Sequence, residues 1–300
     1  MMKNGIALII TLGIIAIITA IVLNSITLID KSFQQTSKVQ SLIQNQLILT
    51  HMQKALNQLS SEITEPAALQ AMMGEFPGLS DDDGKFILGF SLRPAQAKTN
   101  INGIFNEDNK TLNPAYKELL FTILNLHEVL SPDQMIALIA DTIDLDTVDR
   151  SSETERINLE VDFSNGAIKS FDLLYKLSQT YAKELKDPNI MQVKWEEYFF
   201  LGPLFTPTTL DCDFLSWELA KVLQLRVEAT QGLDQISCDA LSSDQNVTLK
   251  SYNIVPFKKG SPYFIEVEAD FETQNSKGKF KALYDLDSKR MRDIRTFNTL

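Results

Sequence analysis

The sequence MMKNGIALIITLGIIAIITAIVLNSITLID, residues 1–30, sets the organisation of the whole chain. Residues 6–23 contain no charged side chain. Because a hydrocarbon core about 30 Å thick needs roughly 20 apolar residues of helix, we expect a transmembrane helix over residues 6–29. Lys3 is the only cation ahead of this segment, and cations tend to remain cytoplasmic, so we expect residues 30–300 outside the cytoplasm.

The short head of residues 1–5 leaves three interpretations of this segment. A secretory signal peptide has a shorter apolar run, of about 7–15 residues, and then a small-x-small cleavage site, for which the chain offers no convincing candidate. A simple N-terminal anchor remains open. In the third interpretation, the head ending in Gly5 resembles a type IV prepilin leader. This resemblance implies that prepilin peptidase cleaves after Gly5 and that the new amine of Ile6 is methylated.

Ile10 would be the fifth residue after such a cleavage, where pilins of this family carry a glutamate. A carboxylate in hydrocarbon is costly unless it is paired, and in the filament it pairs with the terminal amine of the subunit ahead. A subunit with none ahead of it has no partner for this group. The general secretion pathway protein K family, minor pseudopilins of type II secretion, lacks the glutamate and occupies the tip. Ile10 therefore favours this family.

The composition limits the possible partners of the chain. Its 300 residues suffice for one large domain or two ordinary ones, and its net charge of −11 disfavours nucleic acid as a ligand. The two cysteines, Cys212 and Cys238, would lie in an oxidising compartment. They could form a disulfide or remain two buried thiols, because sequence alone cannot show that they approach.

After the apolar segment, the beginning and the end of the chain show the hydrophobic periodicity of helix and of strand, respectively. Residues 31–61 contain no Gly or Pro and place apolar side chains at helical spacing, which predicts a continuous N-terminal helix of about 50 residues, roughly 75 Å long. Alternating runs at 252–257, 263–271, 279–285 and 291–297, with a further run at 86–92, predict antiparallel strands. The expected class is α+β, a pilin-like α/β roll in which the N-terminal transmembrane helix packs on an antiparallel sheet.

The middle of the chain is predicted to be a large inserted, mainly helical domain. We expect helices over 115–130, 131–143, 170–186, 190–200 and 215–225, the first of them capped by Asn113 and opened by Pro114. Residues 97–104 and 137–150 resemble stretches of the protein K family. The domains are then a leader at 1–5, a transmembrane helix at 6–29, a stalk helix with the first pilin-like part at 30–102, the insertion at 103–245 and C-terminal strands at 246–300.

An acidic segment follows the helix predicted at 131–143. Asp144 and Asp146 alternate in a chain that leaves a helix, so both carboxylates can face one point. Asp149, Glu153 and Glu155 lie near enough in sequence to join them, and hard cations take 6–8 oxygen ligands. Similar proteins bind calcium in the inserted domain, which makes this loop the candidate calcium site. A solvated acidic turn is the alternative.

The sequence nominates no catalytic residue, since it lacks a Gly-rich phosphate loop, a nucleophile elbow and His/Cys zinc spacing. We therefore expect no enzyme. The resemblance implies a minor pseudopilin of the bacterial inner membrane that helps initiate and cap the type II secretion pseudopilus and so supports export across the outer membrane. Its implied partners are the I- and J-type minor pseudopilins, the inner-membrane assembly platform and prepilin peptidase. A minor pilin of a type IV pilus or DNA-uptake system and a membrane-anchored periplasmic enzyme are the alternatives.

Overall fold

The computed structural model describes residues 37–80, 86–106, 111–206, 209–225, 236, 238, 241, 246–258, 262–273 and 276–299. The predicted leader, with its cleavage between Gly5 and Ile6, and the predicted transmembrane helix at 6–29 lie outside these residues. Within the described ranges, no helix combines the length and the apolar character that crossing a membrane requires. The chain divides into two compact units, one built from the described residues up to Ala95 and from Phe257 onward, the other from Gln96–Pro256.

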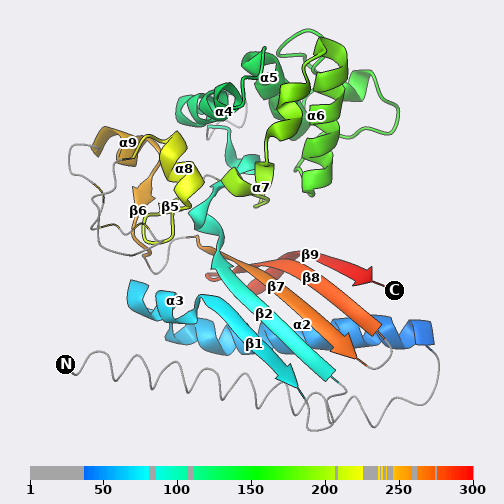
Figure 1. Ribbon diagram of the computed structural model, residues 1–300, viewed down its shortest axis with the longest axis vertical. Helices are drawn as coiled ribbons and strands as arrows, with labels where there is room; N and C mark the ends of the chain where they lie inside the picture. The colour runs from blue at the N-terminus through cyan, green and yellow to red at the C-terminus, as the bar shows by residue number, and fades with distance from the viewer. Residues whose placement is uncertain are drawn as a thin grey trace. The chain divides into compact units, whose positions relative to one another are not determined.

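The first unit contains a five-stranded sheet (Figure 1). Its strands are β1 (Gly74–Ser80), β2 (Phe86–Pro94), β7 (Phe264–Thr273), β8 (Ser276–Asp285) and β9 (Arg290–Thr299). They pair in the order β1-β2-β7-β8-β9, and every pair is antiparallel. The chain therefore leaves the sheet after β2 and returns at its neighbour β7. The predicted α+β class with an antiparallel sheet is confirmed.

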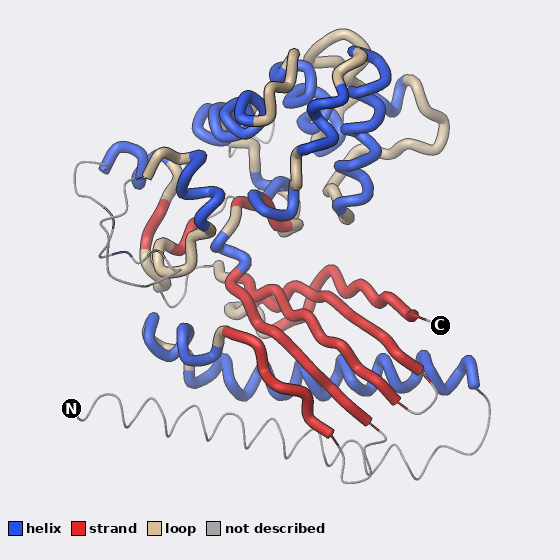
Figure 2. Tube along the Cα trace, in the orientation of Figure 1, coloured by secondary structure: helices blue, strands red, loops and turns tan. Residues whose placement is uncertain are grey.

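Helix α2 (Ser37–Glu62) lies along one face of this sheet and is followed by the short helix α3 (Pro66–Met72) (Figure 2). Side chains three or four residues apart form the buried stripe of α2, namely Ile48, Met52, Ala55, Leu56 and Leu59. The Tyr284 hydroxyl of β8 lies 2.9 Å from the side-chain amide of Asn57 and 3.0 Å from the Ser60 hydroxyl. The described part of the predicted N-terminal helix thus packs on the sheet as expected.

The two faces of the sheet differ in polarity because side chains alternate along each strand. The face toward α2 buries Leu88, Phe90 and Leu92 of β2, Ile265, Val267, Ala269 and Phe271 of β7, and Phe280, Ala282 and Tyr284 of β8. The opposite face carries cross-strand ion pairs, such as Lys277 with Glu272 at 2.7 Å and Lys281 with Glu268 at 3.0 Å. In the C-terminal strands, the side chains therefore point alternately toward α2 and toward solvent, as the sequence pattern predicts.

Two features of the strands depart from the sequence prediction. Strand β1 has no counterpart among the predicted strands: it contains Pro77 and Gly78, yet it forms an edge strand with a bulge between Phe76 and Leu79. Proline is tolerated in such a place because an edge strand leaves some N–H groups unpaired. The strand predicted at 252–257 is wrong: only β6 (Ile254–Val255) forms, and it pairs in parallel with β5 (Leu210–Asp211) of the second unit.

The second unit is mainly helical. It contains α4 (Pro114–Leu126), α5 (Pro132–Ile143), α6 (Phe171–Leu185), α7 (Trp195–Tyr198), α8 (Trp217–Val222) and α9 (Asn246–Ser251), with the short parallel pair β3 (Thr99–Asn100) and β4 (Phe199–Phe200). Asn113 caps α4 by accepting a hydrogen bond from the Ala115 N–H, as predicted. The continuous helix predicted at 190–200 is wrong, because α7 is a single turn between the 3-10 turn Pro188–Gln192 and β4.

Two buried asparagines connect separate segments of the second unit. The Asn102 side chain donates to the carbonyls of Ile168 (3.1 Å) and Gly202 (2.9 Å) and accepts from the Ile168 N–H (2.8 Å). Asn100 accepts from the Gly202 N–H (2.9 Å) and donates to the carbonyls of Pro203 and Thr206. These bonds satisfy backbone groups that do not belong to a regular ladder, so they fix the start of α6 and the segment after β4.

Candidate metal centre

The connection between α5 and α6, residues 144–170, is called the acidic loop below. Asp144 ends α5, its N–H donates to the Ala140 carbonyl at 2.9 Å, and its side chain is turned into the protein with the residue only 2% exposed. The structure brings one carboxylate oxygen each of Asp144, Asp146 and Glu155 within 4.8 Å of one another. Three of the five acidic residues predicted from sequence spacing thus converge.

The remaining two predicted residues are placed differently. Asp149 accepts a hydrogen bond from the backbone N–H of Glu155 at 2.6 Å, so it shapes the turn that delivers Glu155. Glu153 is exposed, adopts a left-handed backbone with φ of 61°, and is not a member of the converging group in the described part of the chain.

Asn165 joins the group although no sequence pattern pointed to it. Its Nδ2 donates to Glu155 Oε1 at 2.7 Å and to the Asp146 carbonyl at 2.8 Å. It follows Glu155 by ten residues, a distance at which spacing carries no information about contact. Asn165 therefore connects the two limbs of the acidic loop at the carboxylate cluster.

Arg150 supplies the positive charge on one side of the cluster. Its guanidinium contacts Asp144 Oδ2 at 2.6 Å and Asp141 Oδ1 at 3.1 Å, and its carbon Cζ lies 5.3 Å from the ring centre of Phe105. Asp141 also accepts from the Arg150 N–H at 2.9 Å and from the Thr154 hydroxyl. Arg150 thus offsets the negative charge of Asp141 and Asp144.

Burial and the repulsion of neighbouring carboxylates raise the pKa values of Asp144 and Glu155. The pKa of Asp144 rises from 3.8 to about 7, first because of burial and then because of Asp146, Asp141 and Glu155, even though Arg150 opposes the shift. Burial also raises the pKa of Glu155, and the Asn165 hydrogen bond only partly offsets this effect. The protein alone therefore lacks enough positive charge here to keep the whole cluster ionised near neutral pH.

The oxygen atoms of the cluster fit a hard cation. No described residue donates a hydrogen bond to Asp144 Oδ1, Glu155 Oε2 or Asn165 Oδ1, although all three atoms are buried. Buried acceptors without a donor are unfavourable and infrequent in folded proteins. Calcium binds carboxylate and amide oxygens of this kind. The donor set that the structure assembles thus agrees with the predicted calcium site in chemistry.

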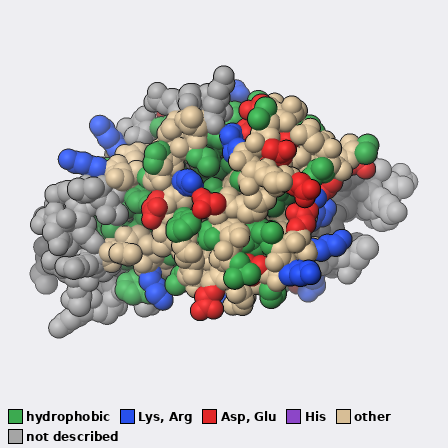
Figure 3. Space-filling view, turned by 90° about the horizontal axis from the view of Figure 1, so that it is seen from above, with side chains coloured by type: hydrophobic (Ala, Val, Ile, Leu, Met, Phe, Trp, Pro, Cys, Tyr) green, Lys and Arg blue, Asp and Glu red, His purple; other side chains and the backbone are tan. Residues whose placement is uncertain are grey.

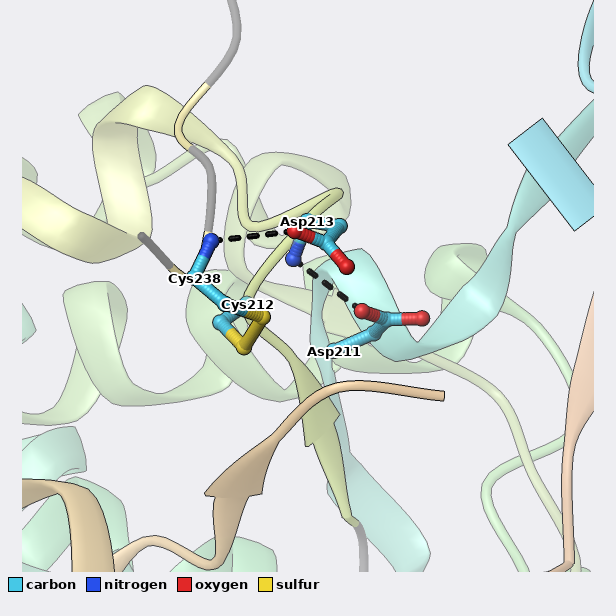
Figure 4. Close-up of a disulfide and its surroundings, with 4 residues drawn as sticks. All are labelled: Asp211, Cys212, Asp213 and Cys238. Atoms are coloured by element: carbon cyan, nitrogen blue, oxygen red, sulfur yellow. Dashed lines mark hydrogen bonds between the residues drawn. A yellow bond between two sulfur atoms is a disulfide. The ribbon is translucent and has the colours of Figure 1, made fainter. Parts of the chain in front are cut away.

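The two cysteines form a disulfide in the second unit (Figure 4). The Cα atoms of Cys212 and Cys238 are 4.9 Å apart. Asp213 Oδ1 accepts from the Cys238 N–H at 3.0 Å, and Asp211 Oδ1 accepts from the Asp213 N–H at 3.0 Å. Although Asp211 lies close to both sulfur atoms, these are bonded to each other, so they offer no thiolate to a metal ion.

No protein-family model and no curated protein matches the chain. Among solved structures, it is similar to a chain in the crystal structure of the GspK-GspI-GspJ complex from the type 2 secretion system of enterotoxigenic Escherichia coli. The match has a TM-score of 0.53 and 13% sequence identity, and it covers 88% of this chain and 97% of the other. The chain therefore has the fold of a subunit of that complex.

Proposed function

We propose that the chain is a minor pseudopilin of the GspK type, a subunit of a type II secretion pseudopilus. The observation that carries the proposal is the position of the insertion. The first unit is a helix packed on a sheet, as in pilins, and its strands β2 and β7 are neighbours in that sheet. The whole second unit, Gln96–Pro256, is inserted in the sequence between these two strands. The likeness to a chain of the GspK-GspI-GspJ complex extends over 88% of the chain and includes both units.

The sequence supports a more specific role at the filament tip. The apolar segment 6–29 inserts in the inner membrane and is processed between Gly5 and Ile6 by prepilin peptidase. With Ile10 in place of the glutamate, the helix needs no amine from a subunit ahead of it. The chain then packs beside I- and J-type minor pseudopilins, seeds the filament on the assembly platform and caps it. Its work is assembly rather than catalysis.

Mass spectrometry of the protein from its native cell tests the processing step. We expect a mature chain that begins at N-methylated Ile6. An intact N-terminus at Met1 or Met2 would contradict the proposal.

As a second test, residues 6–29 are replaced by an unrelated membrane-spanning segment of the same length. Export should then fail, because the helix must pack among related helices, whereas a merely anchored enzyme would keep its activity after the exchange.

Co-purification of the full chain in detergent separates this role from that of a type IV pilus subunit. A minor pseudopilin should carry I- and J-type subunits through purification. A minor pilin would carry major pilin instead, and that result would overturn the assignment to type II secretion.

We further propose that calcium binds to Asp144, Asp146 and Glu155, next to the Asn165 amide. The support is the set of buried oxygens to which no described residue donates a hydrogen bond, together with the raised pKa values of Asp144 and Glu155. Calcium should raise the melting temperature of the wild-type protein, and the combined change Asp144→Ala and Asp146→Ala should remove this rise. The change Asp162→Ala, an exposed carboxylate of the same loop, is the matched control and should keep it. Equal melting temperatures of the wild type in calcium and in chelator would exclude the site.

A further inference from the structure

The acidic loop exposes an unusual number of large apolar side chains. Val161 is fully exposed, and Val148 (69%), Leu145 (68%) and Leu159 (53%) are more than half exposed. With Ile157 (37%), these residues are called the apolar ridge below. Single exposed apolar side chains are ordinary, but a contiguous set of them often marks an interaction site.

Hydrogen bonds between the two limbs of the loop bring the members of the ridge together. Leu145 and Val148 belong to the first limb, and the other three belong to the second. Asn158 Nδ2 donates to the Thr147 carbonyl at 3.1 Å, and Asn165 Nδ2 donates to the Asp146 carbonyl at 2.8 Å. These bonds pair neighbours of ridge residues across the limbs, so the two limbs that carry the ridge lie side by side.

The backbone beneath the ridge is held in place. Arg156 is largely buried and pairs with Glu160 at 2.7 Å and with Glu184 of α6 at 2.8 Å. The Glu160 N–H donates to the Arg156 carbonyl at 2.8 Å, and the Gly166 N–H donates to the Thr142 carbonyl of α5 at 2.8 Å. A surface fixed in this way loses little conformational entropy when a partner binds.

The charges around the ridge select the partner. Asp146, Asp149, Glu153 and Asp162 are exposed among its members. Of the three cations of the loop, Arg150 pairs with Asp141 and Asp144, Arg156 pairs with Glu160 and Glu184, and Lys169 is exposed two residues before α6 begins. Figure 3 shows one face of the protein on which hydrophobic, acidic and basic side chains are interspersed. A complementary partner must combine apolar side chains with cations.

We propose that the apolar ridge is a docking site for an amphipathic helix of a partner protein that carries Lys or Arg beside its apolar residues. Such a helix buries its apolar side on the ridge and places its cations against the exposed carboxylates. A membrane surface is the poorer occupant, because anionic lipid headgroups repel the same carboxylates. The inference concerns a surface that the proposed role in secretion does not specify, and it holds or fails separately from that role.

Photo-crosslinking in the native cell tests the proposal on the full chain. A photoreactive amino acid is introduced at Val161, and at Leu130 as a control, since Leu130 is 71% exposed outside the ridge. We expect the Val161 probe to crosslink a protein segment that mass spectrometry identifies as apolar and net basic, with little product from the Leu130 probe. Lipid adducts, an acidic or uncharged segment, or equal yields at the two positions would overturn the proposal.

Variants of the ridge test the recognition itself. With the probe at Val161, Leu159→Ser and Asp162→Lys should each lower the crosslink yield about fivefold or more, because one removes apolar contact and the other reverses a complementary charge. Glu65→Lys, the same charge change at an exposed site of the first unit, should leave the yield unchanged. The melting temperatures of all three variants should match that of the wild type, because the altered side chains are exposed. Unchanged yields with both ridge variants would exclude the ridge as the contact.

Discussion

Asp144 experiences two opposing effects whose balance depends on pH. Arg150 favours its ionised form through a contact of 2.6 Å, while burial and the neighbouring carboxylates favour the neutral form. The second effect prevails and raises the pKa of Asp144 to about 7. Near neutral pH, a bound cation and a proton therefore compete for the same carboxyl group.

We predict that Asp144 makes the protein less stable in chelator as the pH rises from about 4 to about 7. In this window the folded state retains the Asp144 proton, whereas the unfolded chain, with a pKa of 3.8, has lost it. The folded state then binds more protons, so the free energy of unfolding falls as the pH rises. Denaturant unfolding at several pH values measures the slope.

The variant Asp144→Asn isolates this contribution. It removes the titrating group and leaves others unchanged, such as Glu268, whose pKa is held below its ordinary value by Lys279 and Lys281 despite burial. The difference in unfolding free energy between wild type and variant should depend on pH in chelator. Saturating calcium should reduce or reverse that dependence, because the ion replaces the proton. Parallel pH profiles of the two proteins in chelator would refute the prediction.

Asn102 is the second residue whose single change should have a large effect. Asn102→Ala leaves the N–H and the carbonyl of Ile168 and the carbonyl of Gly202 without their partner in a buried site. Each unsatisfied group costs about 1–3 kcal/mol, so we expect a loss of about 3 kcal/mol or more. Denaturant unfolding measures it. Asn106→Ala, which removes an exposed bond to the Thr111 hydroxyl and a long, partly buried one of 3.5 Å to the Leu112 carbonyl, should cost less than about 1 kcal/mol, and equal losses would contradict the argument.

At the level of elements, the sequence predicts those strands in which apolar and polar side chains alternate regularly. Strand β7 alternates Ile265, Val267 and Ala269 with acidic residues, and this pattern alone predicts a sheet with one buried face. β1 has no such pattern: it contains Pro77 and Gly78, which a strand tolerates at the edge of a sheet or at a bulge. Whether a segment lies at an edge is decided by the tertiary structure and not by its local sequence. Similarly, β6 exists only because β5 offers it a partner from more than forty residues earlier, which no local pattern contains.

In the candidate site too, some features follow from the local sequence pattern and others depend on tertiary contacts. The alternation of Asp144 and Asp146 after a helix was sufficient to predict that both face one point. Asn165 and the counter-charge of Arg150 depend on how the loop folds back on itself, which is a tertiary property. Glu153 is exposed on a left-handed backbone at φ 61° and is not a member of the converging group in the described part of the chain.

The disulfide is the element-scale feature with the simplest prediction. Cys212 and Cys238 are separated by 26 residues, and a cross-link over such a loop stabilises the folded state by about 3 kcal/mol, mainly by restricting the unfolded chain. The double change of both cysteines to serine should lower the free energy of unfolding by about this amount. The calcium response should remain, because none of the three clustered acidic residues lies in that loop. An unchanged stability would show that the cross-link is absent from the protein in solution.

At the scale of the whole molecule, the insertion leaves the sheet continuous. Pro94, at the end of β2, is opposite Ile265 on β7, so the chain departs and returns on neighbouring strands. The hydrophobic cluster of the second unit runs from Ile101 to Ile254, and none of the first unit's described residues belongs to it. Each unit therefore has its own core, as independent folding requires.

We predict that residues 96–256, expressed alone in an oxidising compartment, form a folded domain with the Cys212–Cys238 disulfide and the calcium response. The matched fragment 103–245 has the boundaries predicted from the sequence, but it lacks Asn100, Asn102 and β6. Because those residues hold Gly202, Ile168 and β5 in place, we expect the shorter fragment to melt at a much lower temperature or to remain unfolded. Circular dichroism and amide NMR dispersion measure the comparison. An unfolded 96–256 fragment would mean that its core depends on the first unit, and equal melting temperatures would mean that the asparagine contacts contribute little.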